Sequence, residues 1–170
     1  MREPRFARQT VGTLPRVTSL VLLCADGSPR SLAALRAGLA LLGSHVEPVV
    51  VTVVHEPDLM AVTGTGFASG VLSSEEFDRE VAAAHQAGAQ VVADVQRELG
   101  LGETASHVLT GQPGPAICEL AGSLGAAAIV IGTRGHGGLR RAVLGSVSDH
   151  VVRHAPCTVV VTGPEGVDEG

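Results

Sequence analysis

The chain contains no lysine, no tryptophan and no tyrosine, and only 3 of its 170 residues are phenylalanine. Without lysine it cannot supply the ammonium group that a GxxxxGKS/T phosphate loop places on the β- and γ-phosphates of a nucleotide. Aromatic residues make up 2% of the chain and the formal charge is −5, so there is neither a stacking platform for bases nor a global basic field. We therefore expect neither a P-loop nor a nucleic-acid partner.

Long hydrophobic runs and paired cysteines are also missing. No apolar stretch approaches the roughly 20 residues that cross a bilayer, and the first 16 residues lack the continuous apolar run of a signal peptide. The cysteines Cys24, Cys118 and Cys157 are widely spaced, with no CxxC pair and no Cys/His cluster at zinc-ligand intervals, so we expect plain buried thiols. These absences predict a cytoplasmic protein with no membrane partner and no metal ligands.

The length and composition suit one compact domain. With 170 residues and 45% hydrophobic content, the chain is expected to bury roughly two-thirds of its unfolded surface in a single core. We assign residues 17–163 to this domain, 1–16 to a flexible N-terminal arm and 164–170 to a flexible C-terminal tail. The arm carries four arginines, which either contact an acidic partner or simply remain solvated.

Strands and helices alternate along the predicted domain. Apolar, β-branched runs predict strands over 17–24, 45–54, 105–109, 127–131 and 157–162. Start signals, stop signals and helical spacing predict helices over 29–42, from a capping box at 73–76 to residue 99, over 115–124 and over 146–154. This alternation is typical of a parallel sheet with helices on both faces, a three-layer α/β/α sandwich. Ligands of such folds bind beyond the carboxyl ends of the strands, where the strand order reverses.

A glycine-rich segment lies between the fourth predicted strand and the last predicted helix. Glycines let backbone N–H groups close on an anion, and a helix start, here predicted to be capped by the hydroxyl of Ser146, presents a positive dipole end. A GxGxxG dinucleotide fingerprint is excluded, because the first strand runs into Cys24-Ala25-Asp26-Gly27-Ser28-Pro29 instead. The segment therefore predicts a phosphate site. The alternative is an ordinary surface connection.

The spacing Gly132-x2-Gly135-x9-Gly145-Ser146 resembles that of the universal stress protein family, in its UspA-like subgroup whose nucleotide-binding members carry G-x2-G-x9-G-S/T. Ala25-Asp26-Gly27-Ser28 is also similar to this family, and the resemblance covers residues 17–162. It implies an adenine nucleotide alpha hydrolase-like, Rossmann-like fold with strand order 3-2-1-4-5. It also implies ATP as ligand, with or without Mg²⁺, and a homodimer through strand five, Cys157 to Thr162.

The resemblance further implies where the nucleotide is bound. Asp26, opposite Gly132, would accept hydrogen bonds from ribose or the adenine amino group; alternatively, its carboxylate merely favours the following helix start. The main chain of Val53 would read the adenine edge. By its charge alone, Arg134 either contacts phosphate or simply keeps the surface solvated. The complete set of expected positions is Cys24, Ala25, Asp26, Val53, Ile131, Gly132, Thr133, Arg134, Gly135, His136, Gly137, Gly138, Gly145, Ser146, Val147 and Ser148.

Three functions are compatible with such a site. The first is a dimeric, nucleotide-dependent module of the stress response, the second a slow ATP hydrolase or nucleotidyl enzyme, and the third a nucleotide-free protein-interaction scaffold. Asp26 and His136 are the titratable candidates for catalysis besides arginines, and neither has an evident partner in the sequence to orient it. The sequence therefore favours a binding module, and we assign no catalytic residue.

Overall fold

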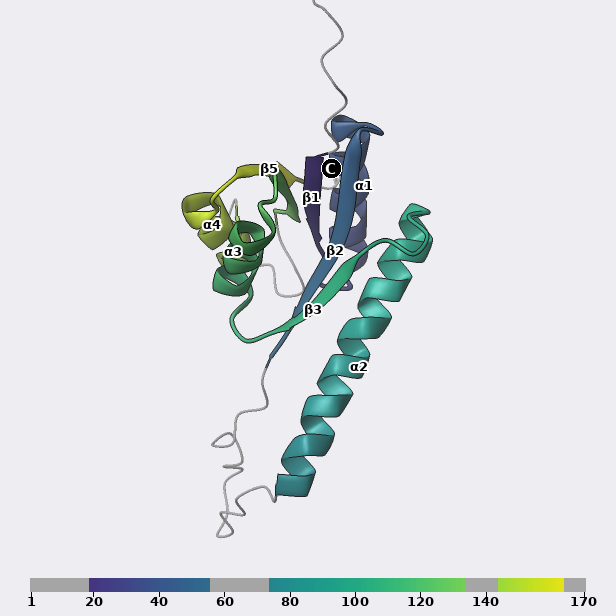
Figure 1. Ribbon diagram of the computed structural model, residues 1–170, viewed down its shortest axis with the longest axis vertical. Coiled ribbons are helices and arrows are strands. Elements are labelled where there is room, and N and C mark those ends of the chain that lie inside the picture. Colours follow the sequence, from purple (N-terminus) through teal and green to yellow (C-terminus); the bar gives the residue numbers. More distant parts are fainter. Residues whose placement is uncertain (1–18, 56–73, 134–143, 164–170) are drawn as a thin grey trace, which may run out of the picture.

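The computed structural model describes residues 19–55, 74–133 and 144–163. Within them, five strands form a parallel sheet in the order β3-β2-β1-β4-β5 (Figure 1). The strands are β1 (Ser19–Cys24), β2 (Val46–Val54), β3 (Ser106–Thr110), β4 (Ala128–Gly132) and β5 (Thr158–Thr162), and the helices are α1 (Pro29–Leu42), α2 (Ser74–Leu99), α3 (Pro113–Leu124) and α4 (Ser146–His154). The predicted alternation, fold class and strand order are confirmed. The predicted arm and tail lie outside the described residues.

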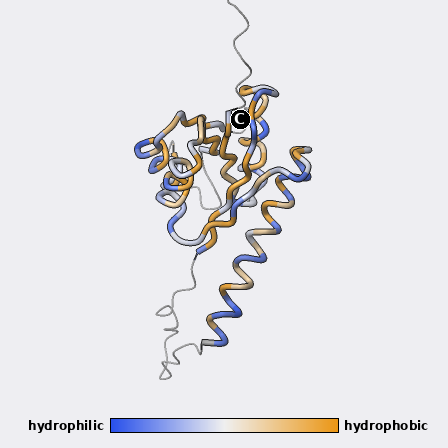
Figure 2. Tube along the Cα trace, in the orientation of Figure 1, coloured by the Kyte–Doolittle hydropathy of each residue, from blue (hydrophilic) through white to orange (hydrophobic). Residues whose placement is uncertain are grey.

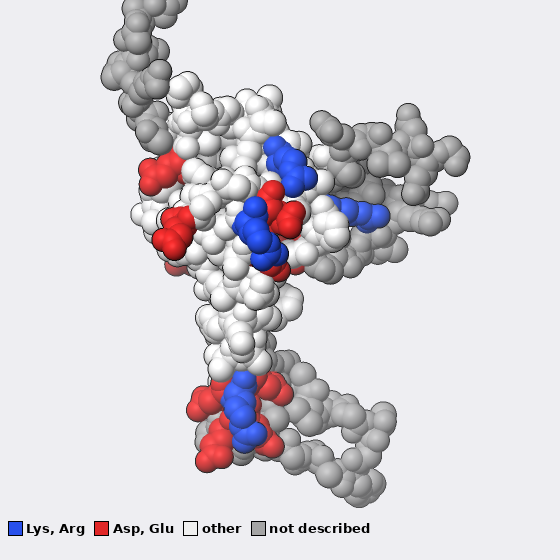
Figure 3. Space-filling model, turned by 90° about the vertical axis from the view of Figure 1, so that its right-hand side faces the viewer, with Lys and Arg blue, Asp and Glu red and all other residues white. Residues whose placement is uncertain are grey.

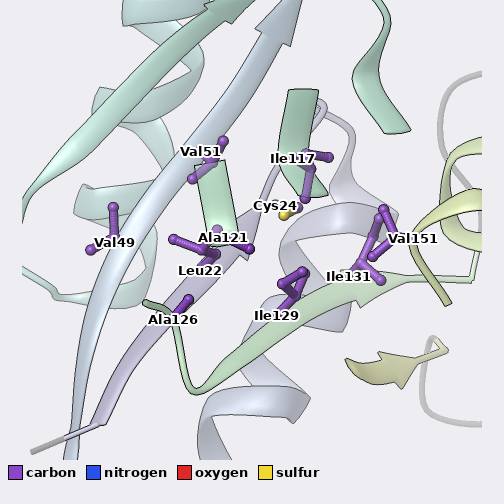
Figure 4. Packing of buried hydrophobic residues seen from close by; sticks show 10 residues of the cluster. All are labelled: Leu22, Cys24, Val49, Val51, Ile117, Ala121, Ala126, Ile129, Ile131 and Val151. Atoms are coloured by element: carbon purple, nitrogen blue, oxygen red, sulfur yellow. The ribbon is translucent and has the colours of Figure 1, made fainter. Parts of the chain in front are cut away.

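Each face of the sheet has its own hydrophobic core, because side chains alternate along a strand. Leu22 of β1 belongs to the core under α3 and α4 (Figure 4), whereas Leu23 belongs to the core under α1 and α2. The crossovers that contain α1 and α2 lead from β1 toward β3, whereas those that contain α3 and α4 lead from β3 toward β5. Because crossovers between parallel strands share one handedness, α1 and α2 cover one face of the sheet and α3 and α4 cover the other. Figure 2 shows the resulting concentration of apolar residues in the central strands.

Local signals account for helix α1. Ser28 is its N-cap, where the hydroxyl oxygen accepts the Ser31 N–H at 3.1 Å, and Pro29 occupies the first helical position. Gly43 follows the last residue with φ 74°, a conformation that favours glycine. All three were expected from the sequence, because capping depends on neighbours within a few residues.

Helix α2 is the longest element, with 26 residues, and its amino-terminal half extends beyond the sheet in Figure 1. Figure 3 shows charged side chains gathered at that end, where the sequence has four acidic residues and one arginine between positions 75 and 80. Acidic residues in a first turn stabilise a helix through its dipole. Among the described residues, no helix is both long and apolar enough to span a bilayer.

Gly88 in the middle of α2 brings the helix close to the sheet. A Cβ atom at this position would lie 2.6 Å from Cγ1 of Val108 and 2.9 Å from Cγ1 of Val54. The glycine therefore lowers helix propensity, as expected from the sequence, but it also permits a helix–sheet distance that no larger residue would allow.

Most predicted boundaries differ from the observed ones by a residue or two, which is ordinary for element ends. The largest difference within the described residues is at α3, which begins at Pro113 and not at Pro115. Pro113 fits there because the first helical N–H has no partner in the helix, so its absence in proline costs nothing.

Candidate functional site

The sheet reverses its order between β1 and β4, and their carboxyl ends lie side by side. Cys24, the last residue of β1, is in register with Ile131 of β4. The chain continues from these two residues into Ala25 and Gly132. These two residues therefore lie beside each other at the carboxyl ends of the strands. This is where ligands bind in open α/β sheets, and it is where the sequence places Asp26 and Gly132.

Side chains at the start of α1 hold the turn that carries Asp26. Its Oδ1 accepts the Ser28 N–H at 2.9 Å and the Ser28 hydroxyl at 2.7 Å, and its own N–H donates to Oγ of Ser31 at 3.3 Å. Asp26 is exposed, while Ser28 and Ser31 are buried. The carboxylate therefore has a structural role at this helix start, and its contact with ribose or adenine stays a prediction.

The main chain of Val53 points to the side of β2 on which β1 lies. Val51 accepts the Ala25 N–H at its carbonyl oxygen, at 2.8 Å, whereas Val54 accepts the Gly111 N–H, at 3.0 Å, on the β3 side. Because backbone groups alternate in direction along a strand, the peptide groups of Val53 point to the same side as those of Val51. On that side β1 has already ended, and the contact of Val53 with an adenine edge stays a prediction.

A hydrogen-bonded set of three residues, Thr133, Gly145 and Ser148, joins the end of β4 to the start of α4. We call it the neck. The carbonyl oxygen of Thr133 accepts the Gly145 N–H at 2.8 Å and the Ser148 hydroxyl at 3.1 Å. Thr133 also donates its N–H to the carbonyl of Thr162 at 3.0 Å, which ties the neck to the end of β5. The residues on either side of the glycine-rich segment, Thr133 and Gly145, are thus held together by a hydrogen bond.

Helix α4 begins at the neck, and its first amides have no partner within the helix. Its N-cap is Gly145, with no side-chain cap bond, and Ser146 is the first helical residue and is exposed. The prediction that the Ser146 hydroxyl caps the helix is therefore wrong. A capping side chain belongs to the residue before the first helical residue, and that residue is Gly145. The first N–H of the helix to bond backward is that of Asp149, to Gly145 at 2.9 Å. The amides of Ser146, Val147 and Ser148 precede this ladder, so the helix start suits an anion.

Other expected positions belong to the core. Cys24, Ala25 and Ile131 are buried, and burial raises the pKa of the Cys24 thiol far above its ordinary value. Their side chains therefore pack, and any contact with a ligand is left to their main chains. The expectation of buried thiols is correct for Cys24 only, because Cys118 and Cys157 are half-buried.

Part of the predicted site lies outside the described residues, namely Arg134, Gly135, His136, Gly137 and Gly138. Gly132 and Thr133, which precede it, are half-buried at the end of β4. Across residues 19–55, 74–133 and 144–163, no three His, Cys, Asp or Glu side chains are grouped so that they could hold a metal ion.

A parallel sheet with this reversal point and with helices on both faces defines a Rossmann-like α/β protein. The model of the universal stress protein family matches residues 19–163, and the chain belongs to this family. Universal stress protein E of Escherichia coli K12 is 34% identical over 71 residues, which are 42% of this chain and 22% of that protein. The chain thus spans less than a quarter of this curated relative's length.

Solved structures share the fold. UspA from Lactobacillus plantarum has a TM-score of 0.67 at 20% identity, covering 85% of this chain and 97% of that one. A universal stress protein in complex with cAMP has a TM-score of 0.56 at 24% identity, covering 86% and 97%. An Arabidopsis thaliana family member with AMP bound has a TM-score of 0.55 at 19% identity, covering 89% and 95%.

Proposed function

We propose that this protein is a nucleotide-dependent module of the stress response that binds ATP across the carboxyl ends of β1 and β4. The observation that carries the proposal is the start of α4, where the amides of Ser146, Val147 and Ser148 precede the helix ladder beside the strand-order reversal. The structural relatives with AMP and cAMP bound support an adenine nucleotide as the ligand.

Each part of the nucleotide has a candidate partner in this arrangement. The phosphates, with or without Mg²⁺, would meet the α4 amides, the exposed hydroxyl of Ser146, and the glycines and Arg134 of the glycine-rich segment. Ribose would lie near Asp26, and the main chain of Val53 would meet the adenine edge. The two ends of the ligand are thus bound by groups from β2 and α4, on either side of β1.

We assign the site to binding and name no catalytic residue. A general base must be free to approach a water or a substrate proton. Asp26, the carboxylate that follows β1, is instead held in its turn by the N–H and hydroxyl of Ser28. This favours a module that senses or stores nucleotide over a hydrolase.

The proposal includes a homodimer formed through β5. This strand pairs with β4 on one side and stands at the edge of the sheet. Thr158–Thr162 contains neither charge nor proline, so nothing in its sequence protects the edge from pairing with another strand. A symmetric copy would cover it. We place the protein in the cytoplasm, where ATP is abundant.

Ligand identification tests this function directly. Protein purified without added nucleotide would be denatured and any released ligand identified by mass, and stripped protein would then be titrated with ATP, ADP, AMP, cAMP and adenosine. We expect saturable binding of ATP and weaker binding of adenosine. A chain that releases no adenine nucleotide and binds none at millimolar concentration would overturn the proposal.

A further inference from the structure

We propose that Ser148 is a positioning residue, whose buried hydroxyl holds the neck so that the first-turn amides of α4 stay aimed at the phosphates. The inference rests on the proposed function. It also gives the Ser148 side chain a role of its own, where the family resemblance implied only that Ser148 is one of the nucleotide-binding positions.

The geometry separates Ser148 from Ser146, although both lie in the first turn of α4. Ser146 is exposed, whereas Ser148 is 1% exposed and is one of the polar residues of the core. The Ser148 hydroxyl lies 3.1 Å from the carbonyl oxygen of Thr133 and 3.0 Å from that of Gly145. A hydroxyl has a single proton, and here it is directed at backbone carbonyls inside the protein. It cannot also donate to a phosphate.

Removing this hydroxyl would loosen one specific connection. Gly145 keeps a donor at its carbonyl, because the Asp149 N–H binds it at 2.9 Å. Among the described residues, the Thr133 carbonyl would keep only the Gly145 N–H as the hydrogen bond that joins the end of β4 to the start of α4. The other side of the neck is anchored, since the Thr133 N–H binds Thr162, whose hydroxyl donates to the Ala34 carbonyl of α1 at 2.7 Å. The helix start would therefore move while the strand end stays.

Amide hydrogen exchange in nucleotide-free protein tests the neck by itself. In Ser148→Ala we expect the Gly145 N–H to exchange about fivefold to tenfold faster, because a hydrogen bond of ordinary strength no longer opposes local opening. The control is Ser123→Ala, which removes a comparable hydroxyl-to-carbonyl bond, from Ser123 to Leu120 at 2.9 Å, on an exposed part of α3. Ser148→Thr should restore protection, because a threonine hydroxyl can also bond to a carbonyl in the preceding helical turn.

Nucleotide affinity then tests the positioning role. We expect Ser148→Ala to weaken ATP about tenfold with adenosine unchanged, and Ser146→Ala to weaken ATP without altering Gly145 exchange. An unchanged exchange rate of the Gly145 N–H in Ser148→Ala would overturn the inference. Loss of protection throughout β1 and β4 would also overturn it, because the hydroxyl would then stabilise the whole fold and not the neck alone. Faster exchange with unchanged ATP affinity would also overturn it. If the wild type binds no nucleotide at all, the proposed function fails, and the exchange experiment still decides whether Ser148 holds the neck.

Discussion

Gly27, in the turn that carries Asp26, lies directly against Val91 of α2. A Cβ atom on Gly27 would stand 2.9 Å from Cγ2 of Val91, and the glycine has φ +80°. The turn at the end of β1 is therefore shaped by a helix that follows more than 40 residues later in the chain. This contact links the proposed nucleotide site to the packing of α2.

Gly27→Ala is expected to destabilise the protein and to weaken ATP. A left-handed conformation costs a non-glycine residue about 1–2 kcal/mol, and the new methyl group must also displace Val91 or the turn. Gly43→Ala is the matched control, because Gly43 has φ +74° and a Cβ atom added there would have no neighbour within 4 Å. Thermal unfolding and ATP titration of both variants separate the effects. An equal loss of ATP affinity in the two variants would show that the Val91 contact is irrelevant.

Gly88→Ala is expected to destabilise the fold by about 1–3 kcal/mol, the usual cost of overpacking. In an open helix interior the same change would stabilise by about 1 kcal/mol, through helix propensity. Gly122→Ala in α3 provides the comparison, because its added Cβ would meet only Cγ of Pro156, at 3.8 Å. Urea unfolding of both variants would show opposite signs. A stabilised Gly88→Ala protein would mean that α2 is not held close to β2 and β3.

Gly145→Val is expected to abolish ATP binding with the fold intact. The backbone of Gly145 has φ −75° and ψ 162°, which any residue adopts, so the variant should fold. Its branched side chain would occupy space where backbone N–H groups meet phosphate. Circular dichroism and ATP titration are the measurements. A folded variant with wild-type affinity would contradict the phosphate site.

Ser146→Ala should weaken ATP more than adenosine. The exposed hydroxyl at the start of α4 is placed to meet a charged ligand, and a hydrogen bond to a charged group is worth roughly 1.5–3 kcal/mol, or about tenfold to a hundredfold in affinity. Isothermal titration with both ligands measures the difference. Equal losses would instead assign the hydroxyl to the structure of the helix start.

Val160→Lys is expected to produce monomers, because it places a charge in the middle of the proposed β5 interface. Ser106→Lys, on the opposite edge strand β3, should leave the dimer unchanged. Equilibrium sedimentation of both variants gives their masses, and circular dichroism confirms that each is folded. A wild-type protein that is monomeric at tens of micromolar would refute pairing through β5.

Signals confined to a few neighbouring residues were sufficient to predict several features of this protein. Helix α1 begins after Ser28, with Pro29 as its first residue, and ends before Gly43, as expected, because capping and stop signals act within one helical turn. The alternation of strands and helices likewise follows from hydrophobic spacing along the chain. The strand order was expected from the family resemblance, and the structure has the same order.

Tertiary structure decided which way particular groups face. Sequence alone places Ser146 and Ser148 equally well at a helix start, and only the position of α4 against the end of β4 buries one and exposes the other. Gly88 is a weak point of a helix by propensity, yet Val54 and Val108, from strands on either side of it in the sequence, require its small size. Local hydrogen bonding and hydrophobic spacing depend on residues that are close in the sequence, so they can be predicted from it. Burial and contact distance depend on elements that meet only after the chain has folded.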